Sequence, residues 1–128
     1  MDRAAPYLIL VGRIILSIIF IQAGWGKIFG YAGTVEHMNA AGVPGTLLPL
    51  VILVELGGGL LVVLGLFTRY AAIALAGFCV LSAWFFHYHP GDMGQMINFM
   101  KNITIAGGFL VLSGSSPGAF ALDNRRRS

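Results

Sequence analysis

The chain has 128 residues, of which 57% are hydrophobic and only 10% are charged, and its formal net charge is +3. Soluble domains average about 45–50% apolar and about 25% charged residues, so a soluble fold of this composition would expose a large apolar surface. The low charge excludes a disordered chain, and the single cysteine excludes a disulfide-rich scaffold. The composition therefore indicates an integral membrane protein.

Four segments are long and apolar enough to cross a bilayer, which takes about 20 residues. They cover residues 6–29, 46–67, 70–87 and 96–113. The first contains Arg13 and is followed by no A-x-A-like cleavage site, so we expect it to be a retained span and not a signal peptide. The connections are short, which predicts an all-α, antiparallel four-helix bundle forming a single transmembrane domain over residues 1–128.

The positive charges near the span ends predict the orientation in the membrane. One side carries Arg3, Arg69 and the tail arginines at positions 125–127, and the other carries Lys27 and Lys101 together with Glu36 and Asp92. Because Lys and Arg accumulate in cytoplasmic loops, we expect both termini to be cytoplasmic. Three arginines without interleaved aromatic residues do not indicate a nucleic-acid partner, and they favour contact with anionic lipid.

Each predicted span has one face of small or polar residues, and such faces point toward neighbouring helices. The first span has Arg13, Ser17, Phe20, Gly24 and Lys27; the second has Glu55, Gly58, Val62, Gly65 and Arg69; the third has Ala72, Ala76, Cys79, Ala83 and Phe86; the fourth has Asn98, Asn102, Ile105 and Phe109, with Lys101 beside them. We therefore expect Gly24, Gly58, Gly65 and Arg69 to be structural residues at helix contacts.

Glu55 lies near the middle of the second span, where an ionised side chain costs about 2.5–3.5 kcal/mol to insert. We expect it to face the bundle interior and to be charge-paired. Arg13 is the favoured partner, because it lies inside the first span and its guanidinium can donate two hydrogen bonds to one carboxylate. Lys27 is the alternative. The ion pair could belong to a functional site, or it could only stabilise the packing of the helices.

The remaining reactive side chains give weaker signals. His87 and His89 close the third span and His37 falls in the first outer loop, a spacing that favours solvated histidines over a metal site. Cys79 is alone and cannot form a dithiol relay. The sequence has no haem, iron–sulfur, flavin or nucleotide motif. Six residues suggest an aromatic belt at the outer interface, namely Trp25, Tyr31, Trp84, Phe85, Phe86 and Tyr88.

Four groups of short motifs follow one another along nearly the whole chain. They are Arg13 with Gly24-x-x-Lys27, then Val54-Glu55-Leu56-Gly57-Gly58-Gly59 continuing to Gly65-Leu66-x-Thr68-Arg69, then Lys101-Asn102 with Gly107-Gly108, and finally Pro117-Gly118 with Leu122-Asp123. This set resembles the DoxX family of small bacterial membrane proteins. The Glu-Leu-Gly-Gly block through Thr-Arg is the most specific part, whereas Ala121 stands where the family pattern has a small hydroxyl residue.

The resemblance implies a multi-pass, four-helix protein of the bacterial inner membrane, in a family often described as oxidoreductase components. It implies a redox-associated subunit that binds a quinone-like lipophilic ligand and acts with a soluble or membrane redox partner, and it leaves homo-oligomerisation open. No catalytic residues are defined for the family. The candidates for ligand binding or a polar core are therefore Glu55, Arg13, Lys27, Lys101, Asn102 and His87.

Two other functions remain as alternatives. The protein could be a non-enzymatic scaffold or assembly factor that docks a partner through its polar helix faces, since no nucleophile–base pair is evident. Transport is less favoured, because four short helices rarely enclose a pathway unless several chains assemble.

Overall fold

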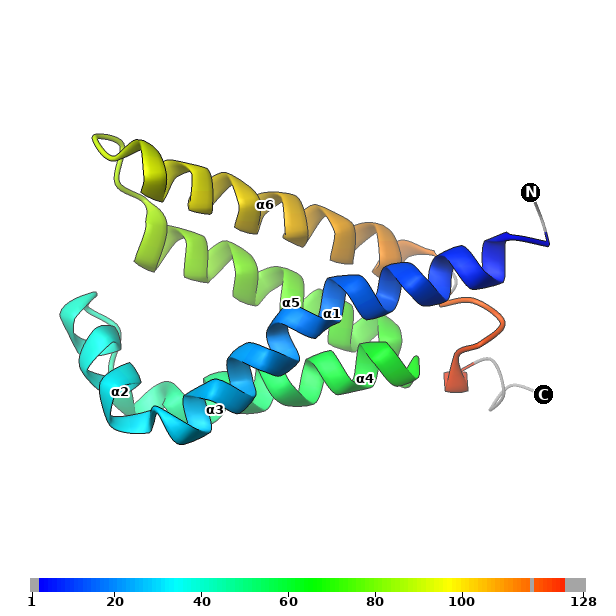
Figure 1. Cartoon of the computed structure of the whole chain (residues 1–128), viewed down its shortest axis with the longest axis horizontal. Coiled ribbons are helices and arrows are strands. Elements are labelled where there is room, and N and C mark those ends of the chain that lie inside the picture. The colour runs from blue at the N-terminus through cyan, green and yellow to red at the C-terminus, as the bar shows by residue number, and fades with distance from the viewer. Residues whose placement is uncertain (1–2, 116, 124–128) are drawn as a thin grey trace.

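The computed structural model describes residues 3–115 and 117–123, which form an elongated bundle of helices (Figure 1). Four helical stretches are long and apolar enough to span a membrane: Ala5–Phe29, Gly45–Leu64, Thr68–His87 and Met93–Gly114. Their boundaries lie within one helical turn of the predicted spans. The predicted all-α membrane fold with four spans is therefore confirmed.

The second and third spans are not uniform α-helices. The second consists of η1 (Gly45–Leu47), α3 (Leu48–Ile52), a π-helical turn η2 (Leu53–Gly57) and α4 (Gly58–Leu64). The third consists of α5 (Thr68–Ser82) and a second π-helical turn, η3 (Ala83–His87). Single π-turns inside α-helices are rare and frequently mark functional sites. The first and fourth spans are the single helices α1 (Ala5–Phe29) and α6 (Met93–Gly114).

The connection between the first and second spans contains a helix, α2 (Tyr31–Ala40), where the sequence suggested a loop. In Figure 1 this helix stands across one end of the molecule, between the start of α3 and the end of α5. Met38 is its buried residue. The Asn39 side chain accepts a hydrogen bond from the Gly45 backbone N–H at 2.9 Å, which ties the end of α2 to the start of the second span.

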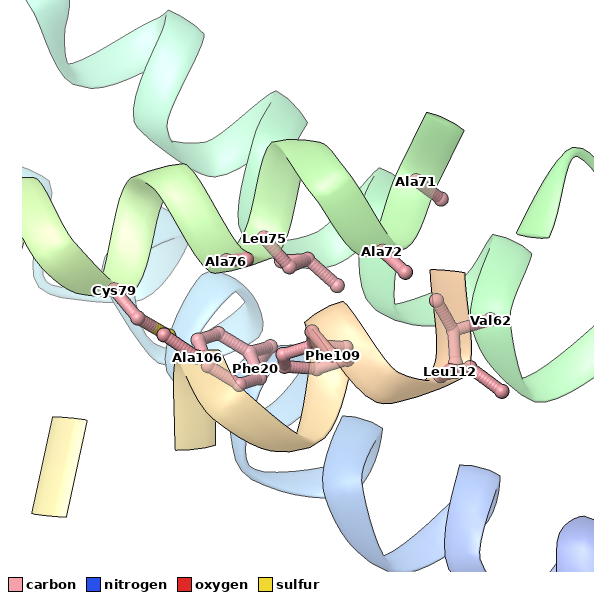
Figure 2. Packing of buried hydrophobic residues seen from close by; sticks show 10 residues of the cluster. All are labelled: Phe20, Val62, Ala71, Ala72, Leu75, Ala76, Cys79, Ala106, Phe109 and Leu112. Carbon is pink, nitrogen blue, oxygen red and sulfur yellow. The ribbon is translucent and has the colours of Figure 1, made fainter. Parts of the chain in front are cut away.

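The core lies along the buried faces of α1, α4, α5 and α6 (Figure 2). Phe20 of α1 packs against Phe109 of α6 with their ring centroids 5.5 Å apart. The other residues of the cluster are Val62, Ala71, Ala72, Leu75, Ala76, Cys79, Ala106 and Leu112. Several of them are small, and small side chains let membrane helices approach closely.

The three glycines predicted to be structural, Gly24, Gly58 and Gly65, all lie at close contacts. A Cβ added to Gly24 would lie 2.9 Å from the backbone nitrogen of Leu56, so α1 and η2 touch through their backbones. A Cβ on Gly58 would lie 3.2 Å from the Leu75 side chain. Gly65 ends α4 with a left-handed backbone (φ +70°), which favours glycine, and a Cβ there would collide with Arg13.

Residues 117–123 fold back over the end of the bundle where α4 meets α5. The Asp123 carboxylate accepts hydrogen bonds from the backbone N–H groups of Phe67 (2.8 Å) and Thr68 (2.9 Å) at the start of α5. The Asp123 backbone N–H donates to the Gly65 carbonyl at 2.8 Å. The tail arginines 125–127 lie outside the described residues, and the orientation of the termini stays a prediction.

Candidate functional site

A cavity of about 560 Å³ lies between α2, the second span and the third span. Ligand sites commonly measure about 300–1,000 Å³. Its wall is mostly apolar, and both π-turns contribute to it, η2 through Val54 and Glu55 and η3 through Phe85, Phe86 and His87. The other lining residues are Lys27, Thr34, His37, Met38, Val43, Leu47, Leu50, Val51, Ile73, Ala74, Gly77, Phe78, Leu81 and Ser82.

An ion pair forms the most polar part of this cavity. Lys27 Nζ, from the last turn of α1, lies 2.7 Å from Glu55 Oε1, on η2. The Glu55 side chain is only 4% exposed and the Lys27 side chain 27% exposed. Separations near 2.7–2.9 Å are typical of strong charge-assisted contacts. Glu55 is thus buried and paired as expected, but with the partner that the sequence analysis favoured less.

The predicted pairing of Glu55 with Arg13 is wrong. Arg13 Nη1 donates to the carbonyls of Val62 (3.1 Å) and Val63 (3.2 Å), and Nη2 donates to the Phe120 carbonyl (3.2 Å). α4 ends at Leu64, so the first two acceptors belong to its last turn, where the helix dipole is negative. The Val62 carbonyl also accepts from the Gly65 backbone N–H at 3.1 Å.

The reason for this error is depth along the antiparallel helices. Arg13 lies level with Val62, which is seven residues from Glu55, or about 10 Å along a helix. Lys27 lies fourteen residues further along α1 than Arg13 and reaches Glu55 from the other end of the bundle. The predicted second span, which extended to residue 67, placed the end of this helix too far along the chain.

His87 lines the cavity close to the start of α6. Its Nδ1 lies 2.8 Å from the amide oxygen of Gln95. A carboxamide oxygen only accepts, so His87 donates through Nδ1–H in this contact. Gln95 was missed in the sequence analysis, because nothing in the pattern singles out a polar residue in the first turn of the fourth span.

Two further candidates lie away from the cavity. Lys101 is exposed on α6 and Asn102 is half-buried there, and neither lines the cavity. The predicted inner face of the fourth span is partly wrong, since Asn98 is also exposed. The buried residues of α6 are Ala106, Phe109, Leu112 and Ser113. The apolar core turned this helix so that its outer-half polar residues point outward.

Arg69 connects the third and fourth spans. It lies in the first turn of α5 and not on the second span, because the chain already turns at Gly65. Its Nε donates to the Ser113 carbonyl at 3.2 Å, and the Ser113 hydroxyl donates back to the Arg69 carbonyl at 3.1 Å. These reciprocal bonds fix the end of α6 against the start of α5.

Histidines near the cavity do not form a metal site among the residues that the structure describes, where no group of three or more His, Cys, Asp or Glu side chains comes together. His37 instead stacks on Phe86, with ring centroids 5.2 Å apart and an interplanar angle of 14°. This contact joins α2 to η3. The sequence analysis missed it, because it depends on the unpredicted helix α2.

Fold and site together define a small polytopic membrane protein with a ligand-sized, ion-paired cavity within its spans. The chain belongs to the DoxX family, whose model matches residues 8–88. It is 53% identical over 115 residues to Inner membrane protein YqjF of Escherichia coli (strain K12), an alignment covering 90% of this chain and 88% of that protein. This relationship and the four spans identify an inner-membrane protein.

Two other relatives extend the comparison. Inner membrane protein YphA of Escherichia coli (strain K12) is 40% identical over 129 residues, covering 95% of this chain and 92% of that protein. "Putative oxidoreductase CatD" of Bacillus subtilis (strain 168) is 36% identical over 67 residues, covering 52% of this chain and 50% of that protein. No solved structure matches the chain.

Proposed function

We propose that this protein is a redox-associated membrane subunit that binds a quinone-like lipophilic ligand in the cavity beside Lys27 and Glu55. The observation that carries the proposal is the ion pair itself, which faces a mostly apolar cavity of about 560 Å³ inside the spans. A buried ion pair adds little stability over apolar residues of similar size. Charged residues placed within spans commonly mark a functional site.

The residues of the cavity fit a ligand with an apolar ring and polar oxygens. Lys27 can donate a hydrogen bond to a carbonyl oxygen, and Glu55 can accept or release a proton at its carboxylate. The His87 ring, held through Nδ1 by Gln95, offers a second polar group on the same cavity. The apolar wall holds the ring and excludes water.

The electrons are proposed to come from a partner protein. A quinone, when bound, supplies the redox chemistry, and this chain's residues bind it, orient it and handle protons. The single cysteine cannot cycle as a dithiol. The name of the Bacillus subtilis relative, an oxidoreductase, supports a redox context for the family.

Ligand binding tests this proposal directly. The protein is reconstituted in lipid nanodiscs, and binding of decylubiquinone is measured for the natural chain and for Lys27→Met and Glu55→Gln. We expect each substitution to weaken binding about 10- to 100-fold, since loss of a charged hydrogen-bonding group costs about 1.5–3 kcal/mol. Lys101→Met is the matched control, because Lys101 lies outside the cavity, and it should bind like the natural chain. Absence of binding to the natural chain overturns the proposal.

A scaffold function is supported by a different surface. Asn98 and Lys101 are exposed on α6, three residues apart on one helix face, within a predicted span. Under this alternative, Lys101→Met reduces copurification of a membrane partner while Lys27→Met does not. Under the quinone-binding proposal, Lys101→Met leaves quinone binding unchanged and Lys27→Met weakens it. The two variants therefore distinguish the two functions.

A further inference from the structure

We propose that the ligand enters the cavity sideways from the bilayer, between α3 and α5, and that it therefore carries a long apolar tail that remains among the lipid acyl chains. This inference rests on the proposed function, in that it takes the cavity to be a ligand site. It adds the chemical class of the ligand, a tailed amphiphile, and excludes a small water-soluble molecule as the preferred occupant.

The first observation is that α2, which stands at one end of the bundle (Figure 1), contributes Thr34, His37 and Met38 to the cavity lining. Three contacts hold this helix in place. Met38 is 3% exposed and lines the cavity. His37 stacks on Phe86 of η3. Asn39 accepts the hydrogen bond from the Gly45 backbone N–H. A ligand coming from the aqueous phase at this end would have to displace α2.

The second observation is that one wall of the cavity is open to the outer surface of the spans. Several lining side chains from the two flanking spans are 44–59% exposed, namely Leu47, Leu50, Ile73, Leu81 and Phe85. α5 packs closely on α4, whereas α3 packs on α1, η1, η2 and α2, so the second and third spans diverge toward α2. In water such an apolar rim would be unfavourable, but in the bilayer core it contacts acyl chains.

The third observation is the distribution of polar groups along the cavity. Glu55 lies eight residues from Leu47, or about 12 Å along the second span, and is nearly fully buried. Leu47, at the rim, is apolar and exposed. A ligand that matches both the ion pair and the apolar rim has a polar head at the ion pair and an apolar tail that crosses the rim. Its tail is then solvated by the lipid.

Gly77 supplies a precise probe of this opening. It lies on α5, lines the cavity, and a Cβ added to it meets no atom within 4 Å. A side chain added at this position therefore begins in open space at the cavity wall. Gly107 on α6 is the matched control, because an added Cβ there also meets nothing within 4 Å and the residue does not line the cavity.

The test uses the full chain in lipid nanodiscs and compares two probes, decylubiquinone and the tail-less 2,3-dimethoxy-5-methyl-1,4-benzoquinone, with affinities corrected for partition into lipid. We expect the tailed probe to bind about tenfold tighter or more and Gly77→Phe to slow its association about tenfold. Gly107→Phe should leave the rate unchanged. Asn39→Ala, which loosens α2 from Gly45 outside the cavity, should also leave it unchanged.

Each other result overturns a defined part of the proposal. Equal affinity for the two probes, or an association rate that Gly77→Phe leaves unchanged, rules out lateral entry, while the loss of binding in Lys27→Met would still support the site itself. Faster association in Asn39→Ala places the entrance at α2 and also rules out lateral entry. If neither probe binds the natural chain, the ligand site and its entrance are both wrong.

Discussion

Lys27 and Glu55 differ in how well each charge can reach water when the partner charge is removed by substitution. The Glu55 side chain is 4% exposed and lines the cavity. Lys27 lies in the last turn of α1, is about a quarter exposed, and has a long side chain that can extend toward the membrane surface. The energetic consequences of removing the two charges are therefore unequal.

Lys27→Met should destabilise the protein more than Glu55→Gln does. The first change strands a buried carboxylate, at a cost of about 3 kcal/mol, the low end for breaking a buried pair. The second leaves a lysine that can reach the interface. The double variant should be close in stability to Glu55→Gln alone. Melting temperatures in one detergent or lipid check this order, and strictly additive losses would show that the two charges do not interact.

Arg13 acts as a cap supplied by a neighbouring helix. Its guanidinium satisfies two carbonyls at the end of α4 and one in the C-terminal segment. The guanidinium carries its N–H donors on separate nitrogens of a planar fork, so Nη1 and Nη2 reach acceptors in two different segments. The same charge complements the negative end of the α4 dipole.

Arg13→Lys should therefore be a damaging substitution although it keeps the charge. An ammonium reaches fewer of the three carbonyls, and we expect a loss of about 2 kcal/mol, since hydrogen bonds to charged groups contribute about 1.5–3 kcal/mol each. Arg69→Lys is the matched control, because one side-chain bond to Ser113 is at stake. A similar fall in melting temperature for both variants would contradict the capping role of Arg13.

At the scale of helices, the contact between α1 and η2 is set by Gly24. The nearest atoms to an added Cβ belong to the Leu56 backbone and its Cβ, neither of which can rotate away. At Gly58 the nearest atoms belong to the end of the Leu75 side chain, which can adjust. The backbones of the first two spans, and not only their side chains, therefore determine this contact.

Gly24→Ala should consequently cost more than Gly58→Ala. Forcing backbones apart costs about 1–3 kcal/mol, whereas an added Cβ at Gly58 requires the Leu75 side chain to shift by only a few tenths of an ångström. Gly33→Ala on α2 is the control, since an added Cβ meets nothing there and alanine favours a helix. Thermal unfolding in detergent measures the three variants. Equal stability of Gly24→Ala and Gly33→Ala would show that α1 and η2 are further apart than described.

Sequence patterns predicted the long elements well and the short ones poorly. Hydropathy and length gave the four spans, because each must bury about 20 apolar residues in lipid. The polar stripe of the first span also proved correct, since Arg13, Ser17, Phe20 and Gly24 are its buried residues. α2 was missed because its ten residues carry no strong apolar stripe. The π-turns were missed because they change the helix period by one residue without changing composition.

The candidate site was only partly predictable for a related reason. Three of the six candidate residues, Glu55, Lys27 and His87, line one cavity. Their pairing depends on helix tilt and on where α4 ends, which amino-acid spacing does not specify. Likewise, Lys101 looks equivalent to Lys27 in the sequence, but the rotation of α6 exposes it. The charge of Glu55 near the middle of its span predicted that this side chain is buried and paired, but the sequence did not predict its partner.

At the scale of the whole molecule, the charge distribution predicts the orientation in the inner membrane. The end bearing Arg69 and the described C-terminal segment is expected to face the cytoplasm, and the end bearing α2 and Asp92 is expected to face outward. The cavity would then lie in the outer half of the bilayer, where its ligand is drawn from the outer leaflet.

Cysteine accessibility checks this orientation in a Cys79→Ala background. Gly33→Cys and Gly91→Cys are suitable outer probes, since an added Cβ at either glycine meets no atom within 4 Å. We expect both to react with a membrane-impermeant maleimide in intact cells, and Ser128→Cys to react only after the cells are opened. Labelling of Ser128→Cys in intact cells would show that the positive-charge argument gives the wrong orientation.

The cap formed by Arg13 has a consequence for the timing of biogenesis. Arg13 is synthesised early, yet the carbonyl of Phe120 that it binds lies 107 residues later in the chain. At roughly 5–20 residues per second, translation delivers this last acceptor about 5–20 seconds after the arginine. During that interval the charge must be accommodated at the translocon or the membrane surface. Arg13 can therefore bind the α4 carbonyls of Val62 and Val63 first, and the cap is complete only after residue 120 has been synthesised.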